Sequence, residues 1–214
     1  MKVNKISFNN IDTSEIISMA DMFRGCSNLK HLDLSNFDTS NVTNMQCMFQ
    51  DCSNLKQLDL SNFNTSTVTS MASMFEGCNR LETLDVSNFD TSNVKDMAFL
   101  FQKCSSLKRL DLSSFDTGNV ESMECMFISC LNLQELDISN FNTSKVKSMR
   151  YMFKGCVNLI HLDISNFNLI NINDVTGIFE GLYSLKGIKL PKDQKSREML
   201  IKQLRENDIH CKII

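Results

Sequence analysis

The chain has 214 residues, of which 22 % are charged, and its formal net charge is −3. Acidic and basic residues are interspersed, so the sequence lacks the basic face of a nucleic-acid-binding protein, and no nucleic-acid partner is expected. No stretch approaches the roughly 18 consecutive apolar residues of a membrane-spanning helix, so direct membrane insertion is not expected either.

A 26-residue repeat runs through most of the chain. Two phenylalanine columns keep this step, beginning at Phe23 and Phe37. Six cysteines keep it as well: Cys26, Cys52, Cys78, Cys104, Cys130 and Cys156. A period of this size is typical of a solenoid, in which each coil buries its apolar side only against its neighbours.

The repeat defines the domain organisation. Residues 1–16 align with half a repeat and residues 17–190 hold the repeats, so we predict a single solenoid domain over 1–190 with about eight coils. Eight strand-like segments, from Ile6–Phe8 to Ile188–Leu190, predict a parallel sheet about 34 Å long, from a step of ~4.8 Å per coil.

The coil 45–69 shows the pattern within one repeat. The apolar residues of 45–52 follow an i, i+3, i+4, i+7 spacing, which predicts a short helix or 3₁₀ turn with one buried face. In Leu58-Asp59-Leu60 the alternation predicts a short strand, with the leucines pointing inward and the aspartate outward. The fold class is therefore α/β, with short parallel strands and short helical turns.

The period stops after Pro191, and residues 191–214 are predicted to form a C-terminal cap. Residues 196–207 have the pattern of an amphipathic helix, and the sequence allows a closing strand over 208–214. A cap is needed because the last coil otherwise exposes its core and its strand edge.

The cysteine spacing favours free thiols. Successive coils lie ~4.8 Å apart, whereas a disulfide needs Cβ atoms ~3.8 Å apart. A ladder of buried thiols is therefore expected in place of disulfides. No Cys-x-x-Cys pair is present, so neither a metal nor another cofactor is expected.

The run 52–61, Cys-Ser-Asn-Leu-Lys-Gln-Leu-Asp-Leu-Ser, resembles the C-x-x-L-x-x-L-x-L core of BspA-type leucine-rich repeats. The full unit resembles the repeat of BspA-like surface proteins common in mycoplasmas and some other bacteria, over roughly residues 3–190. The resemblance implies a right-handed leucine-rich-repeat-like solenoid. It also implies binding to host matrix or cell-surface proteins, and not catalysis.

One column of the repeat carries a carboxylate in each coil. Because these side chains are expected to point outward about one coil apart, they repel one another. We weigh two readings: hydrogen bonds to nearby serines, threonines or backbone N–H groups, or an acidic stripe that faces a basic partner or weakly holds cations such as Ca²⁺. The column contains Asp33, Asp59, Asp85, Asp111, Asp137 and Asp163.

A second outward column varies from coil to coil. Such variation is typical of a recognition surface, and equally of an unconstrained solvated face, so both interpretations stay open. The column contains His31, Gln57, Thr83, Arg109, Glu135 and His161. Together the two columns are the candidate protein-binding surface.

Catalysis is not expected. The chain has only three histidines, and His31 and His161 lie five coils apart, about 24 Å at ~4.8 Å per coil. No glycine-rich phosphate loop or nucleophile elbow is present.

The main functional hypothesis is a non-catalytic protein-binding repeat module of the cell-surface or secreted adhesin type. The alternative is an intracellular scaffold or secreted effector that binds another protein through the exposed strand face. Residues 1–10 show no apolar signal-peptide core, and free thiols favour a reducing compartment, which supports the alternative. A spacer that displays another domain is a third hypothesis. The oligomeric state stays open.

Overall fold

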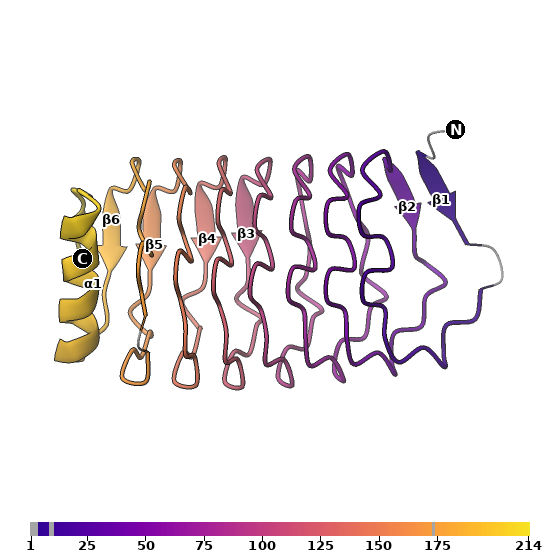
Figure 1. Ribbon diagram of the computed structural model, residues 1–214, viewed down its shortest axis with the longest axis horizontal. Helices are drawn as coiled ribbons and strands as arrows, with labels where there is room; N and C mark the ends of the chain where they lie inside the picture. Colours follow the sequence, from indigo (N-terminus) through magenta and orange to yellow (C-terminus); the bar gives the residue numbers. More distant parts are fainter. Residues whose placement is uncertain (1–3, 9–10, 173) are drawn as a thin grey trace.

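The computed structural model describes residues 4–8, 11–172 and 174–214. The chain forms a row of successive turns along the long axis, and helix α1 (Gln194–Glu206) closes the end opposite the N-terminus (Figure 1). Residues 1–3 and 9–10 of the predicted half-repeat, and residue 173, lie outside the described residues.

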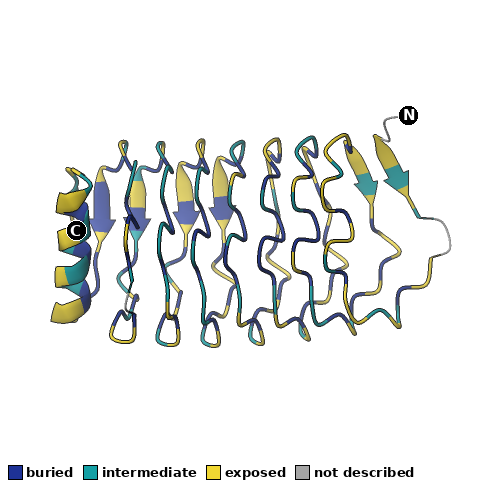
Figure 2. Cartoon of the chain, viewed as in Figure 1, coloured by how far each residue is buried: buried dark blue, intermediate teal, exposed yellow. Residues whose placement is uncertain are grey.

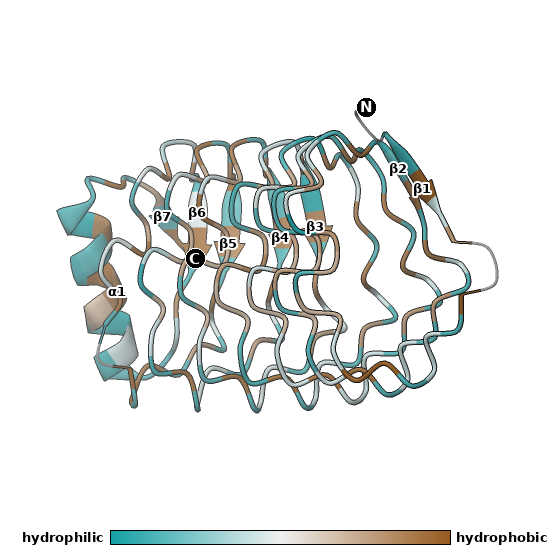
Figure 3. Ribbon diagram, turned by 45° about the vertical axis from the view of Figure 1, so that its right-hand side comes forward, coloured by the Kyte–Doolittle hydropathy of each residue, from teal (hydrophilic) through white to brown (hydrophobic). Residues whose placement is uncertain are grey.

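Seven short strands occur in the described residues, and each paired strand runs parallel to its partner. Pairing joins positions one repeat apart, such as Ile6 with Leu32 and Leu110 with Leu136. In β1 to β5 the central residue is more buried than the outer two, and the hydropathy colouring of the strands also changes along their length (Figure 3). The strands are β1 (Lys5–Ser7), β2 (His31–Asp33), β3 (Arg109–Asp111), β4 (Glu135–Asp137), β5 (His161–Asp163), β6 (Gly187–Lys189) and β7 (Lys212–Ile213). The repeat character and the parallel pairing predicted from the sequence are confirmed.

The continuous eight-strand sheet, however, is a wrong prediction. The strands form three separate sheets, β1-β2, β3-β4 and β5-β6-β7, and residues 57–59 and 83–85 are not strands. Among the described residues, one backbone bond joins these two coils on the strand face, from Glu82 N to Lys56 O at 3.1 Å. Alternation of apolar residues fixes which side chains point inward, but strand pairing also needs adjacent backbones to come within hydrogen-bonding distance.

The predicted short helical turns are also wrong. In the segment 45–52, Cys47 and Asp51 have φ of 55° and 59°, the left-handed region, which a right-handed helix excludes. Met48 N donates to Met45 O at 3.2 Å within the coil, whereas Cys47 N donates to Ala72 O of the next coil at 2.9 Å. Along this segment, backbone N–H groups alternate between donating to a carbonyl of the same turn and donating to a carbonyl of the following coil.

This turn face pairs more continuously than the strand face. Single parallel bridges link each coil to the next from Ser18 through Asn44 and Ser70 to Asp174. Because the same alternating backbone bonds recur from coil to coil, the turn face holds the repeats together where the strand pairing is interrupted.

Buried segments recur in successive coils (Figure 2), and their side chains form interior columns of identical or similar residues. Phenylalanine rings from Phe23 to Phe153 stack with centroids 5.7–5.8 Å apart. All nine cysteines are free, as the spacing predicts. Cys52 Sγ donates to Phe23 O at 3.1 Å, and this bond recurs along the column to Cys156. Burial raises the pKa of the Cys52 thiol to about 12.

A buried threonine column also joins the coils. Each side-chain hydroxyl donates to the backbone carbonyl 25 residues further on, as Thr117 Oγ1 does to Asn142 O at 3.0 Å. Asn142 N donates back to the same hydroxyl at 2.8 Å. These threonines are at most 3 % exposed, and they are Thr13, Thr39, Thr65, Thr91, Thr117 and Thr143. The sequence pattern indicated turns here, but not this contact between coils.

Helix α1 covers the last coil, and its Gln203 replaces the backbone acceptor that the following coil supplies to the equivalent N–H groups elsewhere. It begins after Asp193, whose Oδ1 accepts from Ser196 N at 2.8 Å, an N-cap bond. Ser196 Oγ accepts from Leu169 N at 2.9 Å, and Gln203 Oε1 accepts from Gly177 N at 3.0 Å. β7 follows α1 and pairs with β6.

Candidate functional site

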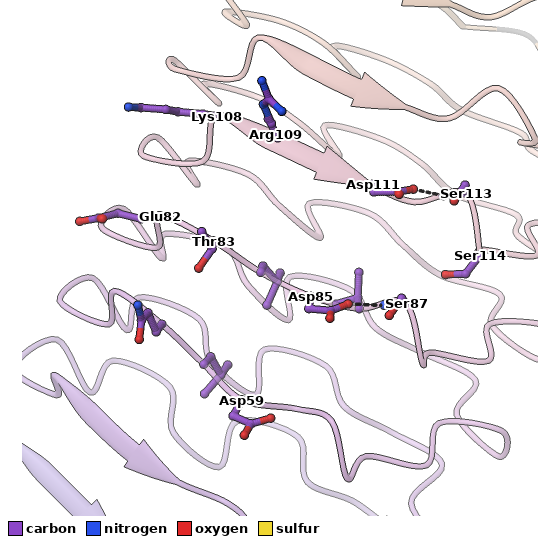
Figure 4. Close-up of a pocket in the computed structure, with 14 residues that line it drawn as sticks. Asp59, Glu82, Thr83, Asp85, Ser87, Lys108, Arg109, Asp111, Ser113 and Ser114 are labelled. Atoms are coloured by element: carbon purple, nitrogen blue, oxygen red, sulfur yellow. Dashed lines mark hydrogen bonds between the residues drawn. The ribbon is translucent and has the colours of Figure 1, made fainter.

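Two grooves lie on the strand face. The first has a volume of about 800 Å³ and is lined by residues from 57–59, 82–87 and 108–114 (Figure 4). The second, also about 800 Å³, is lined by residues from 109–111, 134–139 and 160–163. Leu58, Leu84 and Val86 contribute apolar surface to the first groove, which coincides with the coils whose backbones do not pair as strands.

The candidate binding residues predicted from the sequence gather at these grooves, apart from His31 and Asp33, which lie in β2. Arg109 and Asp111 line both grooves. The first groove adds Gln57, Asp59, Thr83 and Asp85, and the second adds Glu135, Asp137, His161 and Asp163. His31 and His161 are not brought together, because they lie in β2 and β5 at separate positions along the stack.

Each aspartate of the column accepts a hydrogen bond from the serine two residues later. Asp85 Oδ1 accepts from Ser87 N at 3.0 Å, and Asp111 Oδ1 accepts from Ser113 N at 2.9 Å (Figure 4). Hydrogen bonding by the side chain and backbone of Ser113 lowers the pKa of Asp111, and bonding by the backbone and side chain of Ser87 lowers that of Asp85, although the charge of Asp85 raises the pKa of Asp111. Donors to the carboxylate stabilise its charged form, which offsets part of the repulsion between coils.

Two ion pairs join other charged side chains on this face. Lys56 Nζ lies 3.0 Å from Glu82 Oε1, and an Arg109 guanidinium nitrogen lies 2.9 Å from Glu135 Oε1. These side chains are more than half exposed, so each pair contributes at most about 1 kcal/mol. Within the described part of the chain, the aspartates from Asp33 to Asp137 have no such ion pair.

The final carboxylate of the column does have a cation. Lys189, in β6, occupies the position that an aspartate fills in the preceding coils. Its Nζ donates to Asp163 Oδ2 at 2.7 Å, while Asp163 Oδ1 still accepts from Ser165 N at 3.1 Å. One carboxylate of this column therefore binds its serine and an ammonium group at the same time.

Sequence reasoning missed that Ser114, which lines the first groove, stands where other coils have an asparagine. Asparagine side chains clamp adjacent coils, as Asn88 Nδ2 does by donating to Leu60 O at 3.1 Å and to Phe63 O at 3.0 Å. Ser114 occupies this position in the next coil, and no such clamp from it occurs among the described residues. The signal in the sequence was a serine within an otherwise regular asparagine column.

Two further observations concern metal binding and membrane insertion. In the residues that the structure describes, no group of three or more histidine, cysteine or acidic side chains gathers as a metal site. No helix in the same residues has the length and apolarity needed to cross a membrane.

Comparison with known proteins gives one family. No curated protein matches the chain. A family described as "Mycoplasma protein of unknown function, DUF285" matches residues 1–84 and 78–190, most of the chain. The chain therefore belongs to the DUF285 family of mycoplasma proteins.

Proposed function

We propose that this chain is a non-catalytic protein-binding repeat module. Residues 1–190 form a right-handed leucine-rich-repeat-like solenoid of about eight 26-residue coils, and residues 191–214 form its cap. The observation that carries the proposal is that both grooves lie on the strand face. Their lining side chains change from coil to coil, as Gln57, Thr83 and Arg109 do, which supports recognition of a shaped partner.

The proposed class is a BspA-like adhesin displayed at the cell surface or secreted, with a host matrix or cell-surface protein as partner. The BspA-like repeat sequence and the family membership support it. Protease treatment of intact cells that produce the chain tests the location. Digestion at the cell surface, with a cytosolic protein left intact in the same cells, is the expected result. Protection of the chain until the cells are lysed contradicts surface display.

The strand face is tested separately, by selecting binders from a random displayed-peptide library on the purified chain. Thr83→Arg places a large charged side chain in the first groove, at an exposed position. Thr69→Arg makes the same change at an exposed threonine beside Ser70 on the turn face. We expect the selected peptides to lose binding to Thr83→Arg and to keep it with Thr69→Arg. Binders that ignore Thr83→Arg refute the first groove as the site.

A further inference from the structure

We propose that the first groove binds an extended peptide segment rich in lysine or arginine, whose cationic side chains pair with Asp59, Asp85 and Asp111. This inference rests on the proposed protein-binding function and specifies the chemistry of the partner. Four observations on the strand face lead to it: the free carboxylate oxygens, the pairing of the other charges, the Lys189 contact and the arrangement of the column across coils.

Each of the three carboxylates has an oxygen available. The Oδ1 atoms accept from Ser61 N, Ser87 N and Ser113 N at 2.9–3.0 Å. The Oδ2 atoms have no hydrogen-bond donor among the described residues. Since the serine donors lower the pKa of these carboxyls, all three carry a negative charge at neutral pH.

The chain's own cations do not neutralise this column. Lys56 is engaged with Glu82, and Arg109 is engaged with Glu135 of the variable column. Lys108 also lines the groove, but Figure 4 shows it at the opposite end of the strand from Asp111, extending away from the carboxylates. The negative charge of the groove is therefore left for a partner to match.

The contact of Lys189 shows that an ammonium group can pair with a carboxylate of this column. Its ammonium group donates to Asp163 Oδ2 at 2.7 Å without displacing the serine from Oδ1. Asp59, Asp85 and Asp111 repeat the same serine-bound arrangement but lack the lysine. A lysine from a partner reproduces at these coils the contact that the chain makes at its last coil.

The column also favours an extended ligand. Adjacent coils each present one carboxylate, and the segments that carry Asp59 and Asp85 do not pair as strands. In an extended peptide, side chains on one face repeat about every 6.7 Å, and the flexible four-carbon stem of lysine lets each ammonium group adjust to the separation between coils. A peptide that crosses the coils can thus place successive cations on successive aspartates, and it relieves the repulsion between Asp85 and Asp111.

The test measures fluorescence anisotropy of a labelled peptide that alternates serine and lysine, with a serine–glutamate peptide for comparison, on the full chain. Asp85→Asn with Asp111→Asn removes two charges and keeps an oxygen for the serine donors. The matched control is Asp90→Asn with Asp116→Asn. These aspartates lie five residues further along the same coils and also accept backbone N–H bonds, at 3.0 and 2.9 Å.

We expect the lysine peptide to bind at low salt and to weaken as salt rises, because the pairs are exposed. The groove variant should lose about fivefold or more in affinity, and the control less than about twofold. Equal losses in both variants, or binding of the glutamate peptide, overturns the inference.

The displayed-peptide selection separates this inference from the proposed function. Selected binders that respond to Thr83→Arg but lack basic residues refute the basic partner and leave protein binding at the strand face intact. Binders enriched in lysine or arginine that respond to the same substitution support both. If none responds, the first groove fails as the site and the inference fails with it.

Discussion

Replacing Thr117 with valine tests whether buried hydroxyls hold adjacent coils together. Thr117 is 1 % exposed, and its Oγ1 both donates to Asn142 O and accepts from Asn142 N. Valine has nearly the same shape, so Thr117→Val removes both bonds without opening a cavity. Each unpaired buried polar group costs about 1–3 kcal/mol, and because these two are partly buried we expect a loss of about 2–4 kcal/mol.

The assay is urea unfolding followed by circular dichroism, with amide hydrogen exchange at Asn142. A loss of this size is large against the roughly 5–15 kcal/mol that stabilises a typical domain. Thr117→Ser is the control, because it keeps the hydroxyl and loses only a methyl group, at a cost of about 1 kcal/mol. If Thr117→Val costs no more than Thr117→Ser, or leaves exchange at Asn142 unchanged, the reasoning on this column is wrong.

Three further predictions follow from the turns and the thiols. Lys103 has φ 59° in a column that holds glycine in four other coils, Gly25, Gly77, Gly155 and Gly181, so Lys103→Gly should stabilise the chain by about 0.5–1 kcal/mol in urea unfolding. Lys95 has no positive φ, so Lys95→Gly should destabilise the chain. If Lys103→Gly destabilises the chain more than Lys95→Gly does, the strain argument is wrong. In a thiol titration of the native chain, the half-buried Cys26 and Cys211 should react first, and the buried cysteines should react only after denaturation. Uniform reactivity of all the thiols contradicts this prediction. Since burial raises the pKa of Cys52 from 9.0 to about 12, its contribution to stability should be complete below pH 9 and be lost as pH rises towards 12. The Cys52→Ala variant should lose less stability over this pH range than the unchanged chain. An equal loss in both proteins contradicts the prediction.

The candidate site was predictable in part. Alternation in Leu58-Asp59-Leu60 placed the aspartate on the outer face, where it lines the first groove. The groove itself was not predictable, because it depends on how far apart neighbouring coils lie, and a repeat pattern treats all coils alike. Ser114 in the asparagine column was a visible irregularity at this groove.

The apolar columns of the 26-residue repeat determined which residues are buried, because side chains one repeat apart must stack when coils are adjacent. Phe49 and Cys52, expected inside from their columns, are 0 % exposed. The spacing of 45–52 did not determine a helix, since overlapping turns bury the same apolar positions. Only the tertiary structure decided between them. Cys47 and Asp51 take left-handed φ values, and their N–H groups donate to the next coil, a bond that a single repeat read alone cannot supply.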